Sequence, residues 1–180
     1  MNISDENIIN GINNTKWPYR LQKIDHGKIF EILPKDSVFY IDGAHNISGA
    51  KVISDFLKNE KNIDNIDNYI INGRTKDTDS KNYLMQFKGT VNLIVAIRGK
   101  LEGLPESPYV IQKSAHEIGM NCIIGMGIID AVKKIILYHH NIAIDDENLE
   151  NFDSKNYQNP LRICICGSFY LARDLKFEEN

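Results

Sequence analysis

The stretch Val38-Phe39-Tyr40-Ile41-Asp42-Gly43-Ala44-His45-Asn46 decides the fold expected of this chain. Its first four residues form an apolar run typical of a buried strand, and the polar residues after them predict a tight turn. The apolar positions that follow, from Ala50 to Leu57, have helical spacing. A strand, a polar turn and a helix in this order are typical of nucleotide-binding α/β proteins, in which phosphate groups lie at the helix N-terminus.

Three side chains of this turn could contact a nucleotide. At the carboxyl end of a strand, the Asp42 carboxylate can reach ribose hydroxyls, while the His45 imidazole and the Asn46 amide can face phosphate oxygens. Each residue also has a purely structural explanation, because Asp and Asn are common in turns and as helix N-caps. His45 could equally be a partly exposed turn residue. The turn alone leaves both explanations open.

Composition argues against several classes of protein. With 180 residues, 42% of them hydrophobic, the chain is long enough for one well-packed domain. The net charge of -3 offers no basic surplus for binding nucleic acid or an anionic membrane. The N-terminus has no signal-peptide pattern and no apolar run approaches the length of a membrane span. We therefore expect a cytoplasmic protein without nucleic-acid or membrane partners.

The three cysteines do not predict a disulfide framework or a metal site. Their number is odd, and Cys164 and Cys166 alternate along an apolar run that predicts a buried strand. Alternate residues of a strand point to opposite faces of the sheet, so this pair cannot easily bind one metal ion.

Other periodic segments predict an α/β organisation. Strands are expected at 69–71, 91–97, 122–124 and 161–166, and 109–111 is expected as a short strand before a helix through 115–118. Helices are expected at 83–87 and 128–140, and residues 141–159 as a mobile surface loop. Alternating strands and helices predict a Rossmann-like three-layer domain, with a mostly parallel sheet and helices on both faces. Ligands should then lie at the carboxyl ends of the strands.

Four short motifs follow one another along the chain. They are Trp17-Pro18-Tyr19-Arg20-Leu21, the Asp42–Asn46 turn, Lys76-Asp77 and Cys166-Gly167-Ser168-Phe169-Tyr170-Leu171. In this order and spacing they resemble the WPGRL, DGAHNP, KD and CGSLYL motifs of the C-terminal domain of folylpolyglutamate synthase and dihydrofolate synthase, in the Mur ligase family. The resemblance implies a sheet of about six strands. It also implies an ATP-dependent ligase that adds L-glutamate to dihydropteroate or tetrahydrofolate through an acyl phosphate.

The resemblance further implies roles for individual residues. The residues that match ATP-binding positions are Arg20, Asp42, His45 and Asn46. His45 would be catalytic, because the matching histidine contacts the phosphates or the acyl-phosphate intermediate. The residues that match the glutamate pocket are Ser168 and Tyr170. Lys76 and Asp77 match a pair at the same edge of the sheet, although a solvated turn would also explain them.

Two residues depart from the family motifs. Tyr19 stands where the motif has Gly, and a residue with a side chain adopts positive φ only at a cost in energy. If a tight turn is needed there, Arg20 is expected to point elsewhere. Ile47 stands where the motif has Pro, which presets the helical φ angle, so its loss bears on rigidity more than on chemistry.

The resemblance implies that only part of a ligase is present in this chain. Residues 1–16 correspond to a remnant of an interdomain linker and 17–180 to the Mur-ligase-type C-terminal domain, while the N-terminal P-loop ATPase domain is absent. The sequence contains no G-x-x-x-x-G-K-[ST] motif. Mg²⁺ ligands would come mainly from that domain, supplied in cis or in trans, and we expect the chain alone to be inactive. A non-catalytic nucleotide-binding domain, or a remnant of a split ligase gene, is the alternative.

Overall fold

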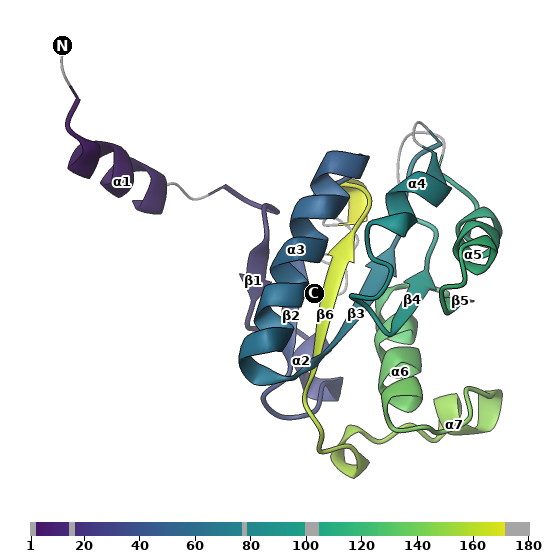
Figure 1. The fold of residues 1–180 in the computed structure, drawn as a ribbon. Coiled ribbons are helices and arrows are strands. Elements are labelled where there is room, and N and C mark those ends of the chain that lie inside the picture. The colour runs from purple at the N-terminus through teal and green to yellow at the C-terminus, as the bar shows by residue number, and fades with distance from the viewer. Residues whose placement is uncertain (1–2, 15–16, 77–78, 100–104, 172–180) are drawn as a thin grey trace.

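The computed structural model describes residues 3–14, 17–76, 79–99 and 105–171 and forms a six-stranded sheet in the order β1-β2-β6-β3-β4-β5. The strands are β1 (Gln22–Ile24), β2 (Val38–Ile41), β3 (Asp67–Asn72), β4 (Leu93–Ala96), β5 (Cys122–Ile124) and β6 (Leu161–Cys166). β1 runs antiparallel to β2 at one edge, and all other neighbouring strands are parallel (Figure 1). The predicted mostly parallel sheet of about six strands is therefore confirmed.

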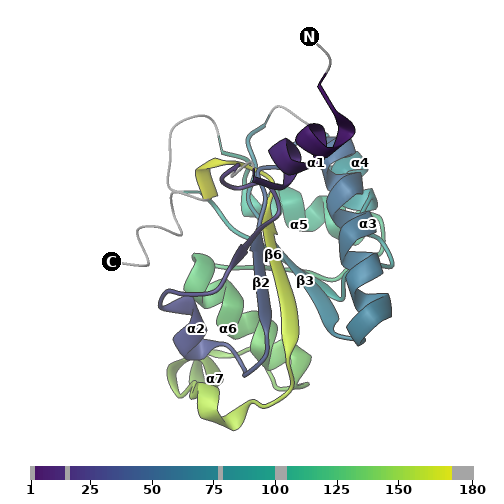
Figure 2. The ribbon, with the colours of Figure 1, turned by 90° about the vertical axis from the view of Figure 1, so that its left-hand side faces the viewer.

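Helices cover both faces of this sheet, as the sequence predicts. α3 (Ile47–Asp64), α4 (Ser80–Met85) and α5 (Pro108–Glu117) lie on one face, and α2 (Ile29–Ile32) and α6 (Ile128–His139) lie on the other (Figures 1 and 2). α1 (Asp5–Asn14) stands apart from this body (Figure 1). Within the described ranges, no helix is both long and apolar enough to cross a membrane.

Alternating strand residues build one apolar cluster on each side of the sheet. Ile71 and Val95 belong to the cluster under α6, whereas Ile70 and Ile94 belong to the cluster under α3, α4 and α5. Because both faces are covered, every residue of β4 and β6 is buried. This rigid sheet fixes the positions of the turns at its carboxyl edge.

Residues 109–111 were predicted as a strand, and this prediction is wrong. They lie in the first turn of α5, which begins at Pro108 after Ser107. Proline is favoured at the first position of a helix because it has no N–H group that would need a partner there. Tyr109 and Val110 are exposed while Ile111 is buried, so this short apolar run is one turn of an amphipathic helix.

Residues 141–159 contain more regular structure than the predicted loop. α7 (Asp146–Glu150) and a 3-10 turn (Ser154–Asn156) lie within this segment. The Asp145 carboxylate accepts a hydrogen bond from the Asn148 N–H at 2.8 Å and so caps α7. Asp145, within the segment predicted as a loop, therefore caps a short helix.

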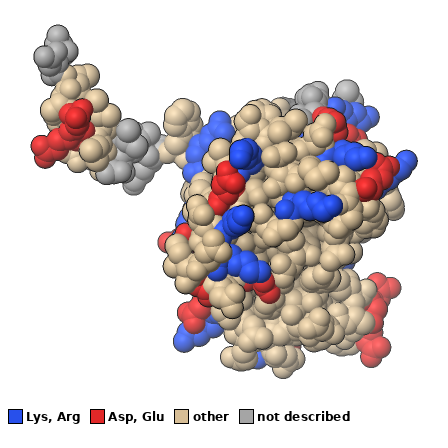
Figure 3. All heavy atoms as spheres, viewed as in Figure 1, with Lys and Arg blue, Asp and Glu red and all other residues tan. Residues whose placement is uncertain are grey.

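Charged side chains do not form a large area of one sign on the face seen in Figure 3. Lys and Arg alternate there with Asp and Glu over α3, α4 and α5. A pair of this kind is Lys51 with Asp55 on α3, whose charged atoms lie 3.6 Å apart. This mixed face matches the absence of a basic surplus in the composition.

Burial of Cys122 predicts that the fold loses stability in alkali. Burial raises the pKa of this thiol to about 12, whereas an unfolded cysteine ionises near about 8.5. The folded chain therefore keeps a proton that the unfolded chain releases, so this contribution is complete below about pH 8.5 and declines as the pH rises toward the folded pKa. We expect a lower urea midpoint at pH 10 than at pH 8. The Cys122→Ala variant should show a smaller decrease, and an equal decrease would contradict this assignment.

Candidate active site

The turns that follow β2, β6 and β3 meet at the carboxyl edge of the sheet. β6 lies between β2 and β3, so the turn after β6 lies between the other two turns (Figure 1). The Gly167 N–H donates to the Ala44 carbonyl at 2.8 Å, and the Gly73 N–H donates to the Cys166 carbonyl at 3.4 Å. Gly167 has φ of 115°, and an added Cβ would lie 2.6 Å from the Gly73 oxygen, so this position requires glycine. The three turns form one hydrogen-bonded surface.

The Asp42 side chain joins this surface to the turn that precedes β1. One carboxylate oxygen accepts a hydrogen bond from the Leu21 N–H at 2.6 Å, and the other accepts from the Ala44 N–H at 2.6 Å. The carboxylate is half-buried, so these charge-assisted bonds hold both backbone segments in place. The structural explanation for Asp42 is thus confirmed, and each oxygen retains a second lone pair for a ligand hydroxyl.

The turn before β1 takes a left-handed backbone in spite of its side chains. Tyr19 has φ of 60° and Leu21 has φ of 46°, a region that non-glycine residues rarely adopt. The Tyr19 carbonyl accepts from the Gly43 N–H at 2.9 Å, and the Tyr19 side chain packs against the cluster under α6. These contacts offset a backbone cost of about 1–2 kcal/mol per residue. Tyr19 therefore keeps a conformation suited to the glycine that it replaces.

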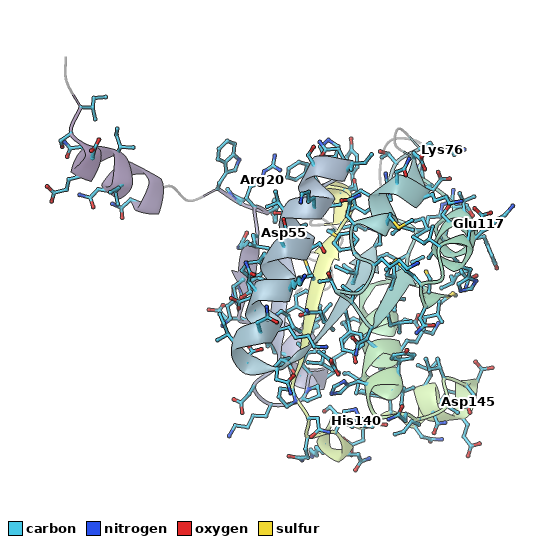
Figure 4. All side chains as sticks on the ribbon, viewed as in Figure 1. Arg20, Asp55, Lys76, Glu117, His140 and Asp145 are labelled. Atoms are coloured by element: carbon cyan, nitrogen blue, oxygen red, sulfur yellow. The ribbon has the colours of Figure 1, made fainter. Side chains whose placement is uncertain are left out.

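Arg20 points toward the site and not away from it. Its guanidinium carbon lies 4.6 Å from the ring centroid of Phe169, which follows β6, and 5.9 Å from that of Trp17. Figure 4 shows Arg20 at the same end of the molecule as Lys76, whereas His140 and Asp145 lie at the opposite end. The expectation that Tyr19 would turn Arg20 elsewhere is therefore not met.

His45 and Asn46 lie at the start of α3. The Asn46 side-chain oxygen accepts a hydrogen bond from the Gly49 N–H at 2.8 Å, which makes Asn46 the N-cap of the helix. The exposed His45 ring has its Nδ1 atom 3.0 Å from the Gly43 carbonyl and its centroid 6.3 Å from that of Phe169. α3 begins at Ile47 even though this residue replaces proline. The structural explanation therefore holds for Asn46.

Ser168 and Tyr170 lie beside a small hollow at this edge. The Ser168 hydroxyl oxygen accepts from the Tyr170 N–H at 3.2 Å. The hollow is lined by Gly73, Arg74, Thr75, Gly99, Pro105, Ser168, Tyr170 and Leu171. Lys76 is exposed and follows the same β3 turn, whereas Asp77 lies outside the described residues. The structure therefore brings the predicted glutamate-pocket residues next to the Lys76 turn.

Two residues beneath these turns, Arg74 and Tyr83, are buried and are not among the predicted site residues. Arg74 is only 3% exposed, and its guanidinium carbon lies 3.9 Å from the ring centroid of Tyr83. Burial lowers the pKa of Arg74 and raises the pKa of Tyr83, so the phenol keeps its proton. The Tyr83 hydroxyl donates to the Ala44 carbonyl at 3.0 Å. A signal was available, since Arg74 comes between a buried strand and the Lys76-Asp77 motif.

The described residues do not form a resident metal centre. A divalent cation such as Mg²⁺ is held by carboxylates and phosphate oxygens. In the part of the chain that the structure describes, no three His, Cys, Asp or Glu side chains are grouped to hold a metal ion. Both Asp42 oxygens already face backbone N–H groups. A metal ion at this site would need ligands from elsewhere.

Comparison with known protein families shows the family to which the chain belongs. The family model for the C-terminal domain of dihydrofolate synthetase matches residues 22–177, which include all six strands. The chain belongs to this family. No curated protein matches the chain.

Solved structures of folate ligases have the same fold. Folylpolyglutamate synthase from Mycobacterium tuberculosis, complexed with ADP, is 14% identical with a TM-score of 0.65, and the match covers 97% of this chain and 35% of that one. FolC from E. coli, in complex with DHPP and ADP, is 15% identical with a TM-score of 0.63 and coverages of 98% and 35%. The bifunctional folylpolyglutamate synthase/dihydrofolate synthase from Yersinia pestis, complexed with AMPPNP and Mn, is 17% identical with a TM-score of 0.58 and coverages of 95% and 33%. The chain thus spans about a third of the length of these enzymes.

Proposed function

We propose that this chain is the C-terminal ATP- and glutamate-binding domain of a folate ligase. The match to the dihydrofolate synthetase C-terminal domain carries this proposal. In the proposed reaction, the γ-phosphoryl group of ATP passes to a carboxylate of dihydropteroate or tetrahydrofolate. The amine of L-glutamate then attacks the acyl phosphate, and an amide forms as inorganic phosphate leaves.

Arg20, Asp42 and His45 would bind ATP at the carboxyl edge of the sheet. The second lone pairs of the Asp42 carboxylate can accept hydrogen bonds from ribose hydroxyls. The Arg20 guanidinium can bind phosphate oxygens and offset the charge that develops during phosphoryl transfer. His45 is exposed at the start of α3, where a helix N-terminus favours negative groups, and Asn46 lies next to it. Nucleotides in the structural neighbours support this assignment.

Ser168 and Tyr170 would contact L-glutamate at the mouth of this hollow, which is itself too small to enclose the amino acid. The Ser168 hydroxyl can donate its hydrogen to a carboxylate while its oxygen accepts from Tyr170. The positive charge of buried Arg74 lies in the wall of the hollow and favours an anionic ligand. Lys76 adds a second positive charge at this edge, and we propose that Lys76 and its sequence neighbour Asp77 take part in this site. A bifunctional folate ligase of this fold has been solved with L-glutamate, Mn and AMPPNP bound.

Catalysis would require a second domain. The structural neighbours are about three times as long as this chain, which has no G-x-x-x-x-G-K-[ST] motif. Phosphoryl transfer depends on phosphate positioning and on Mg²⁺, and the described residues offer no cluster for a metal ion. We therefore assign the P-loop and most Mg²⁺ ligands to an N-terminal domain, joined in cis or supplied in trans. Residues 1–16 would belong to the connection with that domain.

Titration of the isotope-labelled chain with Mg-ATP tests the nucleotide assignment. We expect NMR shift changes in the amides of residues 42–46 and 167–170. The Arg20→Ala variant should bind at least about tenfold more weakly, because a hydrogen bond to a charged group is worth about 1.5–3 kcal/mol. Lys155→Ala removes one positive charge at the other end of the sheet and should bind within twofold of the parent chain.

The control variant separates this site from general charge attraction. Equal losses in Arg20→Ala and Lys155→Ala would show that ATP is held only by overall electrostatics. Shift changes confined to other turns would overturn the assignment of the residues. Binding without any ligase activity in the presence of an N-terminal domain would favour the alternative function, a non-catalytic nucleotide-binding domain or remnant.

A further inference from the structure

The Phe169 ring has contacts on several sides although it is 38% exposed. The Arg20 guanidinium carbon lies 4.6 Å from its centroid, within the range of a cation–π interaction. At Gly43, an added Cβ would lie 2.1 Å from the ring carbon Cε1, so the ring edge rests directly on this glycine. The ring centroid of His45 is 6.3 Å away. Phe169 therefore connects the turns that follow β6 and β2 with the turn before β1.

The Arg20 guanidinium is held by aromatic rings and not by a carboxylate. In addition to Phe169, the Trp17 ring lies near this group, with its centroid 5.9 Å from the guanidinium carbon. Among the residues that the structure describes, no acidic side chain forms an ion pair with Arg20. An aromatic face attracts the cation but does not neutralise its charge. It also does not accept the hydrogen bonds that the guanidinium N–H groups donate in the guanidinium plane. The in-plane donors stay available for the oxygens of an anion.

We propose that Phe169 is a positioning residue that holds the Arg20 guanidinium ready for the phosphate chain of ATP. This inference rests on the proposed function, in which Arg20 binds ATP. A free arginine side chain loses rotamer entropy when it is fixed. The Phe169 ring restricts the Arg20 side chain before the nucleotide binds. Removing the ring therefore weakens ATP binding without removing any group that touches ATP.

Gly43 sets the place of the ring. Its backbone is not left-handed, so alanine fits the local conformation, but the added methyl group would collide with the Phe169 ring edge. The ring is partly exposed and can swing away at little cost in stability. Gly43→Ala should therefore displace Phe169 from Arg20 while leaving both side chains in the chain.

The test compares Phe169→Leu with Phe169→Tyr in the full chain. Leucine keeps an apolar contact with Gly43 and removes the aromatic face, whereas tyrosine keeps both. We expect Phe169→Leu to bind Mg-ATP about three- to fivefold more weakly, the range of a partly exposed cation–π contact, and Phe169→Tyr to bind like the parent. In the ligand-free chain, ring currents should shift the Arg20 side-chain protons further upfield in the parent and in Phe169→Tyr than in Phe169→Leu or Gly43→Ala, where only the more distant Trp17 ring remains beside Arg20.

A double-mutant cycle separates this inference from the proposed function. If Phe169 acts through Arg20, Phe169→Leu should have no further effect on ATP affinity in an Arg20→Ala background. An equal loss in both backgrounds, or no loss in Phe169→Leu while Arg20→Ala binds weakly, would overturn the positioning role and leave the ATP assignment standing. If Arg20→Ala itself binds ATP like the parent, the ATP role of Arg20 fails, and the positioning role fails with it. A urea midpoint for each variant shows that it is folded.

Discussion

Replacing Arg162 by alanine should lower the free energy of unfolding by about 3–5 kcal/mol. Arg162 is the second residue of β6 and is completely buried. Its guanidinium forms an ion pair with Asp64 at the end of α3, lies 3.9 Å from the Glu60 carboxylate, and donates to the Asn68 side-chain oxygen at 3.0 Å. Alanine would leave a cavity in the core and remove the partner of a buried amide. Urea unfolding at neutral pH measures this loss.

Two further variants identify the origin of the loss. Arg162→Met fills most of the volume without the charge, and Asp64 and Glu60 are exposed enough to be hydrated, so we expect about half the loss or less. Lys51→Ala breaks the exposed pair with Asp55 on the same helix and should change stability by less than about 0.5 kcal/mol. A loss below about 1 kcal/mol in Arg162→Ala would show that this ion network does not support the fold.

Asp42→Ala should reduce ADP release by a reconstituted ligase at least about a hundredfold, since two hydrogen bonds to a charged group are lost together with the proposed ribose contact. The reconstituted ligase is this chain combined with the proposed N-terminal P-loop domain, expressed separately. The Asp42 carboxylate holds the Leu21 and Ala44 N–H groups at 2.6 Å each. Without it, the left-handed turn that carries Arg20 is free to relax. Stability should fall as well, by about 1–3 kcal/mol.

His45→Ala is the matched control for Asp42→Ala. The His45 side chain is exposed, so its removal should leave stability within about 0.5 kcal/mol while activity falls. Activity that depends on Asp42 but not on His45 would limit the role of the motif to backbone positioning. Unchanged activity in both variants would show that the ATP site lies elsewhere.

The fold followed from local sequence patterns to a large extent. The run 38–41 and the helical spacing after it predict β2 and α3, and β3, β4, β5, β6 and α6 follow from similar apolar periods. The prediction for 109–111 was wrong because an apolar run of three residues fits both one turn of an amphipathic helix and a short buried strand. β1 and α2 have three and four residues, which are too few to show the alternation of a strand or the apolar spacing of a helix.

Motifs select candidate site residues, whereas contacts that depend on packing leave no signal in the sequence. The motifs select Asp42, Arg20 and Ser168 as candidates, and the structure brings their turns together. Contacts between residues far apart in sequence carry no local signal, and the contact of Phe169 with Gly43 is of this kind. The sequence also did not reveal that Tyr19 takes a left-handed backbone, because hydrogen bonds from another turn stabilise it.

ADP release decides whether the chain is one domain of a folate ligase. The assay contains Mg-ATP, L-glutamate and either dihydropteroate or tetrahydrofolate, and compares the chain alone, the N-terminal P-loop domain alone and the two together. We predict turnover only when both domains and an acceptor are present, and the acceptor that supports it identifies the substrate. Turnover by the chain alone, or no turnover with both domains although the chain binds ATP, would contradict this function.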